Sequence, residues 1–347
     1  MSPAPPVGER FEITVPGSTA NLGSGFDALG MALALRDVVR VEVVDGAPGS
    51  ARVTATGQGA GAVPADERHL VVRMAHRTLA ELGAPAPALS LRCENAIPHS
   101  RGLGSSAAAI VAGVVAGHEL AGRPLRHGAD LGRADLGRAD LDGAEVEWAG
   151  FDGAGFDGAD FDGADLGGTD LDRALQIAAS VEGHADNAAA SLLGGLVIAW
   201  GEGERFRATR LEPHPQLHPV ALVPETESAT HTTRGLLPGE IPHGDGVFAA
   251  GRAALAVHAL TSAPELLLPA TEDRLHQDYR EPAWPGTVDL VRRLRAAGVP
   301  AAVSGAGPTV LALPEGGQLP VEVDLGDFSA LGIPVDRDGV AVERCRN

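Results

Sequence analysis

A glycine- and serine-rich loop that runs into an alanine-rich helix is the feature that most constrains the fold of this chain. The loop, IPHSRGLGSSAAA, occupies residues 97–109, and the Ala- and Val-rich run from Ala107 to Leu120 predicts a helix that ends before Gly122 and Pro124. Glycine lets the backbone approach a ligand closely, and a helix N-terminus exposes free N–H groups at the positive end of its dipole. The pattern predicts a phosphate site, although the same residues can also serve as a simple helix cap.

The chain contains no lysine, and this absence narrows the chemistry. All 27 basic side chains are arginine. Schiff-base enzymes need a lysine amine, and phosphate loops of the G-x-x-x-x-G-K-[ST] type need a lysine ammonium, so both classes are excluded. The predicted loop is therefore a phosphate cradle that works without lysine.

Charge and cysteine usage exclude further classes of function. The formal net charge of −19 argues against a nucleic-acid partner, because phosphate backbones are bound by clustered cations. Cys93 and Cys345 lie far apart without metal-type spacing, so neither a disulfide framework nor a zinc site is expected. We find no targeting segment and no apolar run of membrane-spanning length, and we expect a cytoplasmic protein with no membrane association.

The order of the predicted elements indicates an α+β protein. At 347 residues the chain is long enough for two domains, which we place at 1–205 and 206–347. Only 3% of the residues are aromatic, so the cores must consist of Ala, Val and Leu. Strand-like patterns are followed by a glycine-rich loop at 16–25 and by helix-like periodicities. The predicted strands lie at 11–15, 31–44, 89–97, 196–200, 219–224, 301–307 and 309–313, and the predicted helices at 67–82, 107–120, 173–183, 247–260 and 287–298.

Residues 127–173 form an insert with a different pattern. They repeat every five residues as A-D-L-G-R or A-G-F-D-G, with Leu or Phe at the central position of most units. This period resembles the pentapeptide-repeat family, whose chains wind into a right-handed β-helix. Nine units make little more than two coils, so the alternatives are a short β-helix and an acidic loop. The insert contains thirteen acidic residues and three arginines, so it carries about half of the net negative charge of the chain.

Three more Gly-, Ser- and Asn-rich segments accompany the loop at 97–109. They are PGSTANLGSGFD at 16–27, EGHADNAAASLLGG at 182–195 and SGAGPT at 304–309. In this order, the four segments resemble the motif regions of the GHMP kinases, which phosphorylate small molecules. Within that family, the patterns P-x-S-x-ANLG-x-GFD and EGH-x-DN resemble the homoserine kinases. The resemblance covers nearly the whole chain outside the insert.

This resemblance implies a fold and a reaction. The implied fold is the two-domain α+β GHMP kinase fold, with an N-terminal domain like the second domain of ribosomal protein S5 and a ferredoxin-like C-terminal domain. The implied reaction transfers a phosphoryl group from ATP, with Mg²⁺, to the side-chain hydroxyl of L-homoserine for threonine synthesis. Phosphoryl transfer needs mainly alignment and charge neutralisation, which suits a chain without lysine. The resemblance does not decide between a monomer and a homodimer.

The resemblance also assigns residues to the nucleotide. The loop would wrap the ATP phosphates, and Ser106 with Glu182 would hold Mg²⁺, which prefers hard oxygen ligands. Ser105 is the alternative hydroxyl. The glycine segment at 304–309 would support the loop. The implied phosphate-binding residues are Pro98, Ser100, Arg101, Gly102, Leu103, Gly104, Ser105, Ser106 and Ala107, and the supporting residues are Ser304, Gly305, Gly307 and Thr309.

The remaining residues implied by the resemblance would bind the amino-acid substrate. A carboxylate suits the substrate ammonium and an arginine fork suits its carboxylate. Asp27 with Asn21 fits the first role, and Arg234 with Arg280 fits the second, although either arginine could instead be an ordinary surface residue. Three residues come from EGHADN: Asn187 would bind the reacting hydroxyl, and His184 and Asp186 would shape the loop. Asn187 and Arg234 are the residues expected to serve catalysis.

Some features depart from the family pattern and leave alternatives open. His69 precedes Leu70-Val71 where asparagine is common in the segment that meets the nucleotide base, and Thr233 precedes Arg234 where alanine is usual. The insert enters between the phosphate-loop helix and the helix that carries Glu182, so it could disturb their spacing. One alternative is a GHMP kinase for a different small alcohol, and another is a non-catalytic protein that acts through the acidic insert.

Overall fold

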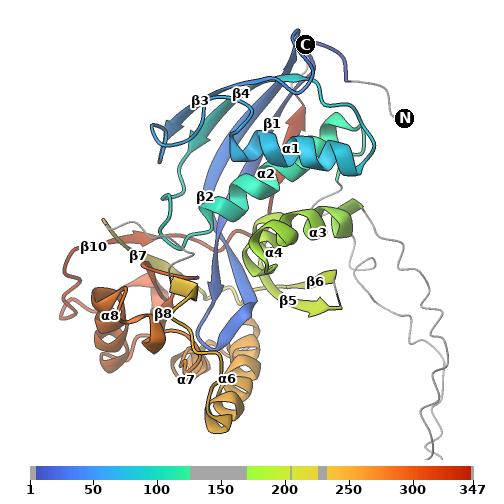
Figure 1. The fold of residues 1–347 in the computed structure, drawn as a ribbon. Helices are drawn as coiled ribbons and strands as arrows, with labels where there is room; N and C mark the ends of the chain where they lie inside the picture. Colours follow the sequence, from blue (N-terminus) through green and yellow to red (C-terminus); the bar gives the residue numbers. More distant parts are fainter. Residues whose placement is uncertain (1–4, 126–169, 204, 226–232, 345–347) are drawn as a thin grey trace, which may run out of the picture.

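The computed structural model describes residues 5–125, 170–203, 205–225 and 233–344, and Figure 1 shows its two sheets and the helices around them. The larger sheet has the strand order β11-β1-β2-β4-β3, and β5 and β6 extend from β2. Among the described strands, only β3 and β4 pair in parallel. Its strands are β1 (Arg10–Asn21), β2 (Gly25–Val44), β3 (Ala51–Gly57), β4 (Ala88–Asn95), β5 (Leu196–Glu202), β6 (Arg205–Leu211) and β11 (Ala341–Arg344).

The long β1–β2 hairpin connects the larger sheet to the site. In β1, Phe11, Ile13 and Val15 are buried in the core, as the alternation of the sequence predicts. The strand does not stop there: it continues to Asn21 through two register shifts. The prediction of a loop at 16–25 is therefore wrong for most of its length, because Pro16, Gly17 and the small polar residues after them still pair with β2.

Three helices contact strands of the larger sheet, α2 (Ser105–Leu120), α3 (Asp170–Glu182) and α4 (Asp186–Leu193), and a further helix, α1 (Leu70–Glu81), packs on α2. Helix α2 is buried on nearly every side, as expected of a helix that is apolar all round. Close packing with α1 requires glycine on α2: a Cβ added at Gly113 would lie 2.4 Å from the carbonyl oxygen of Val71. This packing fixes the position of the start of α2.

The smaller sheet is antiparallel and has the order β10-β7-β9-β8. Its strands are β7 (Val220–Pro224), β8 (Ala301–Val303), β9 (Val310–Ala312) and β10 (Phe328–Gly332). The accompanying helices are α6 (His243–Thr261), α7 (Leu267–Ala270) and α8 (Pro285–Ala296). Leu290 and Leu294 of α8 pack with Val303 and Val310 in a second core. The α+β prediction is confirmed. The predicted elements of this half are present, but the strand predicted at 301–307 ends at Val303, because Gly305 and Gly307 adopt positive φ values in the loop that follows.

The two sheets do not divide the chain at one point. Strand β6 starts at Arg205 and so crosses the predicted boundary, yet it pairs with β5, and the C-terminal strand β11 pairs with β1. The larger sheet therefore takes strands from both sides of the predicted boundary. The division into two domains between residues 205 and 206 stays a prediction. Among the described helices, none combines the length and the apolar character that crossing a bilayer would require.

Most of the acidic insert lies outside the described residues, so the choice between a β-helix and an acidic loop stays a prediction. Its last residues are described: α3 begins at Asp170, before the predicted start at 173, and the carboxylates of Asp170 and Asp172 favour a helix N-terminus. Arg123 and Asp170 form an ion pair at 2.8 Å where the insert leaves and rejoins the core.

The insert joins the core far from the loop at 97–109. Helix α2 has 16 residues and therefore spans about 24 Å at 1.5 Å per residue. The insert connects the C-terminal end of α2 to the N-terminal end of α3. The opposite ends of these two helices, near Ser106 and Glu182, line one pocket and so lie close together. The predicted disturbance of their spacing is not present.

Candidate active site

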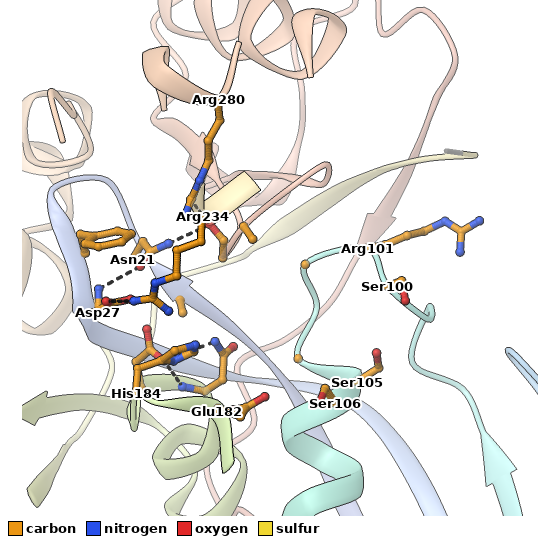
Figure 2. Close-up of a pocket in the computed structure, with 18 residues that line it drawn as sticks. Asn21, Asp27, Ser100, Arg101, Ser105, Ser106, Glu182, His184, Arg234 and Arg280 are labelled. Carbon is orange, nitrogen blue, oxygen red and sulfur yellow. Dashed lines mark hydrogen bonds and ion pairs between the residues drawn. The ribbon is translucent and has the colours of Figure 1, made fainter. Parts of the chain in front are cut away.

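One pocket collects residues from all four glycine-rich segments (Figure 2). It lies between the end of β1, the start of α2, the loop between α3 and α4, and the loop between β8 and β9. Most of the residues predicted to form the site line it. They are Asn21, Asp27, Ser100, Arg101, Gly102, Gly104, Ser105, Ser106, Glu182, His184, Asp186, Asn187, Arg234, Arg280 and Gly305.

The glycines of the loop are required by close contacts between chain segments. Gly104 has φ +70°, and a Cβ there would lie 2.2 Å from the Ser18 hydroxyl oxygen. Gly102 has φ +74°, and a Cβ there would lie 2.4 Å from the Ser304 carbonyl oxygen. Only glycine combines this backbone conformation with such approaches. The loop is thereby fixed against β1 and the segment at 304–309.

The first backbone N–H groups of α2 face the pocket region without intrahelical partners. The first hydrogen bond of the helix runs from Ala108 N–H to Gly104 C=O, so the amides of Ser105, Ser106 and Ala107 precede it. No side chain caps this end. Together with the helix dipole, these donors form an anion site that needs no lysine.

Glu182 places a buried carboxylate beside this helix start. Burial raises its pKa to about 7, while His184 and the Ser106 hydroxyl oppose the shift and Asp186 adds to it. Its Oε2 atom is buried and has no hydrogen-bond partner among the described residues. An unpartnered buried oxygen next to a hydroxyl is a donor set that fits a hard divalent cation.

A buried carboxylate organises the segment EGHADN. Asp186 is 1% exposed, and its Oδ1 accepts hydrogen bonds from the backbone N–H of Asn187 at 2.7 Å and from His184 Nδ1 at 2.5 Å. Burial lowers the pKa of His184, but the hydrogen bond and charge of Asp186 outweigh it, and the net shift is upward. The Ser18 hydroxyl donates to Asn187 Oδ1 at 3.0 Å. Asn187 Nδ2 donates to Asp186 Oδ1 at 3.3 Å, so the side chain of Asn187 is held at both its oxygen and its nitrogen.

Opposite charges meet at the other end of the pocket. Arg234 forms an ion pair with Asp27 Oδ2, and Arg280 lies beside them, 3% exposed. Burial raises the pKa of Asp27, and Arg234 opposes that rise. Asn21 holds the neighbouring backbone, because its Nδ2 donates to the Gly305 carbonyl at 2.7 Å and its Oδ1 accepts from the Asp27 amide at 3.0 Å. This end offers both charges that an amino acid in zwitterionic form needs.

Several predicted residues do not line the pocket. Leu103 and Ala107 are buried in the core. Ser304 supports the loop from outside: its hydroxyl donates to the Gly102 carbonyl at 2.5 Å. Arg101 turns its guanidinium away from the start of α2 and donates to the carbonyls of Pro224 and Glu225 (Figure 2). The predicted residues outside the pocket lining are Pro98, Leu103, Ala107, Ser304, Gly307 and Thr309.

The sequence reasoning missed three pocket residues, Ala20, Phe26 and Ala306. All three lie inside the quoted motifs, so motif membership was the available signal. The guanidinium carbons of Arg234 and Arg280 lie 5.8 and 5.6 Å from the centre of the Phe26 ring, within reach of cation–π attraction.

A second pocket of about 420 Å³ adjoins the first and shares Ser100, Ser105 and Ser106 with it. His69 and His99 line it, and their Nδ1 atoms are buried without hydrogen-bond partners among the described residues. Burial lowers the pKa of His69, and His99 adds to this effect. The second pocket thus places two imidazole rings on a wall that also carries apolar side chains such as Val15 and Val71.

Family models match two parts of the chain. The N-terminal domain model of the GHMP kinases matches residues 69–143, which include the glycine loop and α2. The model of pentapeptide repeats matches residues 151–175, within and just beyond the predicted insert. Both resemblances drawn from the sequence are confirmed.

Curated relatives are similar over most of the chain. A homoserine kinase of Streptomyces avermitilis is 45% identical over 303 residues, which cover 87% of this chain and 84% of the relative. One of Streptomyces coelicolor is 43% identical over 334 residues, covering 95% of this chain and 93% of the relative.

Solved structures share the fold. A homoserine kinase from Cytophaga hutchinsonii superposes with a TM-score of 0.72 at 23% identity, covering 96% of this chain and 98% of that one. A putative homoserine kinase from Listeria monocytogenes gives 0.66 at 25% identity, covering 97% and 100%. With the pocket, the family model and these relatives in agreement, the chain belongs to the homoserine kinases of the GHMP kinase family.

Proposed function

We propose that this protein transfers the γ-phosphoryl group of ATP to the side-chain hydroxyl of L-homoserine and releases O-phospho-L-homoserine and ADP. The observation that carries the proposal is a single pocket with a lysine-free anion site at one end and paired opposite charges at the other. The first end fits a polyphosphate and the second fits an amino acid. The similarity to proteins named homoserine kinase supports this substrate.

The helix start and the loop would bind the ATP phosphates. The amides of Ser105, Ser106 and Ala107 precede the first hydrogen bond of the helix, and donors fixed at a helix start need no reorganisation when charge builds up during transfer. The adjoining pocket that His69 lines would take the nucleotide base, since it opens next to the same serines.

Ser106 and Glu182 are the residues that would hold Mg²⁺. The unpartnered Oε2 of Glu182 supports this role, because a buried oxygen without a partner is costly unless a ligand satisfies it. When bound, the ion would neutralise part of the phosphate charge.

Asp27 would bind the substrate ammonium, and Arg234 and Arg280 its carboxylate. The existing Asp27–Arg234 ion pair supports this assignment. The ammonium group of an amino acid can take the place of Arg234 beside Asp27, and its carboxylate can take the place of Asp27 beside Arg234. Asn187 would then meet the hydroxyl, held by Ser18 and Asp186. In the reaction the hydroxyl oxygen bonds to the γ-phosphorus as the bond from that phosphorus to the oxygen of ADP breaks, and the hydroxyl proton is released to water. The residues contribute mainly by alignment.

The test is turnover of a panel of alcohols by the purified full chain with Mg-ATP. We expect rapid ADP release with L-homoserine and at most slow release with mevalonate or galactose. Fast turnover of another alcohol, with none of homoserine, contradicts the proposed substrate. Removal of divalent metal with EDTA should abolish turnover, and added Mg²⁺ should restore it. A homodimer also remains a prediction. Sedimentation equilibrium tests it by measuring whether the mass in solution is that of one chain or two.

A further inference from the structure

We propose that His276, a residue outside the pocket lining, positions Arg280 for the substrate carboxylate. The inference rests on the proposed function and adds a positioning residue to it. His276 is fully buried, between the loop after β1 and the segment that carries Arg280. Its two ring nitrogens connect these segments, and neither nitrogen faces solvent.

The contacts define which ring nitrogen carries the proton. His276 Nε2 lies 3.0 Å from the carbonyl oxygen of Gly23, which can only accept, so Nε2 must donate. His276 Nδ1 lies 3.0 Å from Nη1 of Arg280, which can only donate, so Nδ1 must accept. Both neighbours therefore require the neutral ring with its proton on Nε2.

This tautomer controls how Arg280 presents its guanidinium. Nη1 donates both to His276 Nδ1 and to the Gly305 carbonyl at 3.0 Å. Both hydrogen bonds that the group makes to described residues use Nη1, so Nη2 is left without a partner among them, while Nε is unpartnered but buried. Nη2 belongs to a side chain that lines the pocket, where it can donate to a substrate carboxylate.

The surroundings hold His276 in place and keep it neutral. Asp273 Oδ2 accepts hydrogen bonds from the backbone N–H groups of His276 at 2.9 Å and Gln277 at 2.8 Å. The Phe26 ring lies 5.2 Å from the imidazole, centre to centre. Burial lowers the pKa of His276 and the charge of Arg280 lowers it further, while Asp273, 3.8 Å away, and Gly23 act in the opposite direction. A proton on Nδ1 would face the Arg280 donor directly.

The experiment compares His276→Leu, which removes both hydrogen bonds, with His276→Gln, whose amide can still accept from Arg280 and donate to Gly23. For His276→Leu we expect the KM for L-homoserine to rise roughly tenfold to a hundredfold, with kcat and the KM for ATP nearly unchanged. His276→Gln should recover most of the affinity. The matched control is His118→Leu, because His118 is equally buried, bonds a backbone carbonyl and lies at the distal end of α2.

A double-mutant cycle distinguishes positioning from general destabilisation. If His276 acts through Arg280, adding His276→Leu to Arg280→Leu should not raise the KM for homoserine further. Additive effects, an equal rise in the KM for ATP, or a rise of the same size in His118→Leu would each overturn the inference. If His276→Leu does not fold, an unchanged KM in His276→Asn, which is too short to span both partners, overturns it instead. Absence of homoserine turnover in the parent protein would refute the proposed function, which is a separate result.

Discussion

Gly104 combines a conformational and a steric requirement in one residue. Its φ of +70° belongs to the left-handed region, and its missing side chain leaves room for Ser18. In the sequence, the place of Gly104 before a helix predicts that glycine is needed there to let a ligand approach the backbone. The structure adds a second reason, because the neighbouring strand occupies the space of a Cβ.

Replacing Gly104 with alanine tests this double role. We expect Gly104→Ala to lower the free energy of unfolding by about 1–3 kcal/mol and to lower kcat, since Ser18 must move and Asn187 moves with it. Gly122→Ala is the matched control: its φ is also +70°, but a Cβ there meets nothing within 4 Å. Chemical denaturation and steady-state kinetics give both quantities. Equal kcat losses in the two variants would contradict the steric argument.

Ser18 is a second residue whose role only contacts reveal. Its hydroxyl donates to Asn187 Oδ1 and accepts from Ser191. We expect Ser18→Ala to lower kcat about three- to tenfold with little change in the KM for ATP, because one hydrogen bond that orients Asn187 is lost. Ser50→Ala, which removes an exposed hydroxyl from a distant turn, should have no effect. An unchanged kcat in Ser18→Ala would show that Asn187 needs no such support.

At the scale of elements, helices α2 and α3 carry the site at one end and the insert at the other. Ser106 lies in the first turn of α2 and Glu182 ends α3, so the site depends on how these two helices pack. The ion pair between Arg123 and Asp170 closes the distal end. The insert therefore joins the protein at the helix ends away from the site. The fold can accept it, because lengthening a loop adds little to the entropic cost of bringing its two ends together.

Removing the insert tests that separation. We expect a chain in which residues 128–167 are replaced by a short Gly-Ser linker to keep kcat/KM for homoserine within about twofold, because the distal junction lies about 24 Å from the phosphate loop. The measurement is steady-state kinetics of both chains, with thermal unfolding to verify folding. A folded variant with more than a tenfold loss would mean that the acidic insert takes part in function.

At the scale of the whole molecule, the proposed phosphate and carboxylate sites rely on arginine and backbone donors in place of lysine, because the chain contains no lysine. Arg234 and Arg280 come from the C-terminal half, whereas Asp27 and Ser106 come from the N-terminal half. The site exists only where the two halves meet. The pairing of β11 with β1 ties the end of the chain to its beginning.

This composition predicts a contrast between two chemical reagents. Amine acylation should leave the kinase active, because the chain has no lysine and only the N-terminal amine can react. Phenylglyoxal, which modifies arginine, should inactivate it, and L-homoserine with Mg-ATP should slow that loss by covering Arg234 and Arg280. Residual activity after each treatment is the measurement. Inactivation by acylation, or a lack of protection by substrates, would contradict the assigned roles.

The sequence by itself determined the family, the glycine-rich loop at 97–109 and most of the pocket residues. Gly102 is identified by its place in a loop before a helix, and Glu182 and Asp186 by a motif that resembles those of the homoserine kinases, because the type and order of motif residues are local features of the sequence. Strong periodicity also located most helices and strands, including α1 and α8.

Only the tertiary structure decided which residues support that chemistry and how the two sheets share the chain. His276, Phe26 and Ser18 have roles that come from neighbours distant in sequence, and β6 and β11 join a sheet whose other strands lie earlier in the chain. Local patterns record backbone preference and burial, whereas hydrogen-bond partners and strand partners arise when segments far apart along the chain come together.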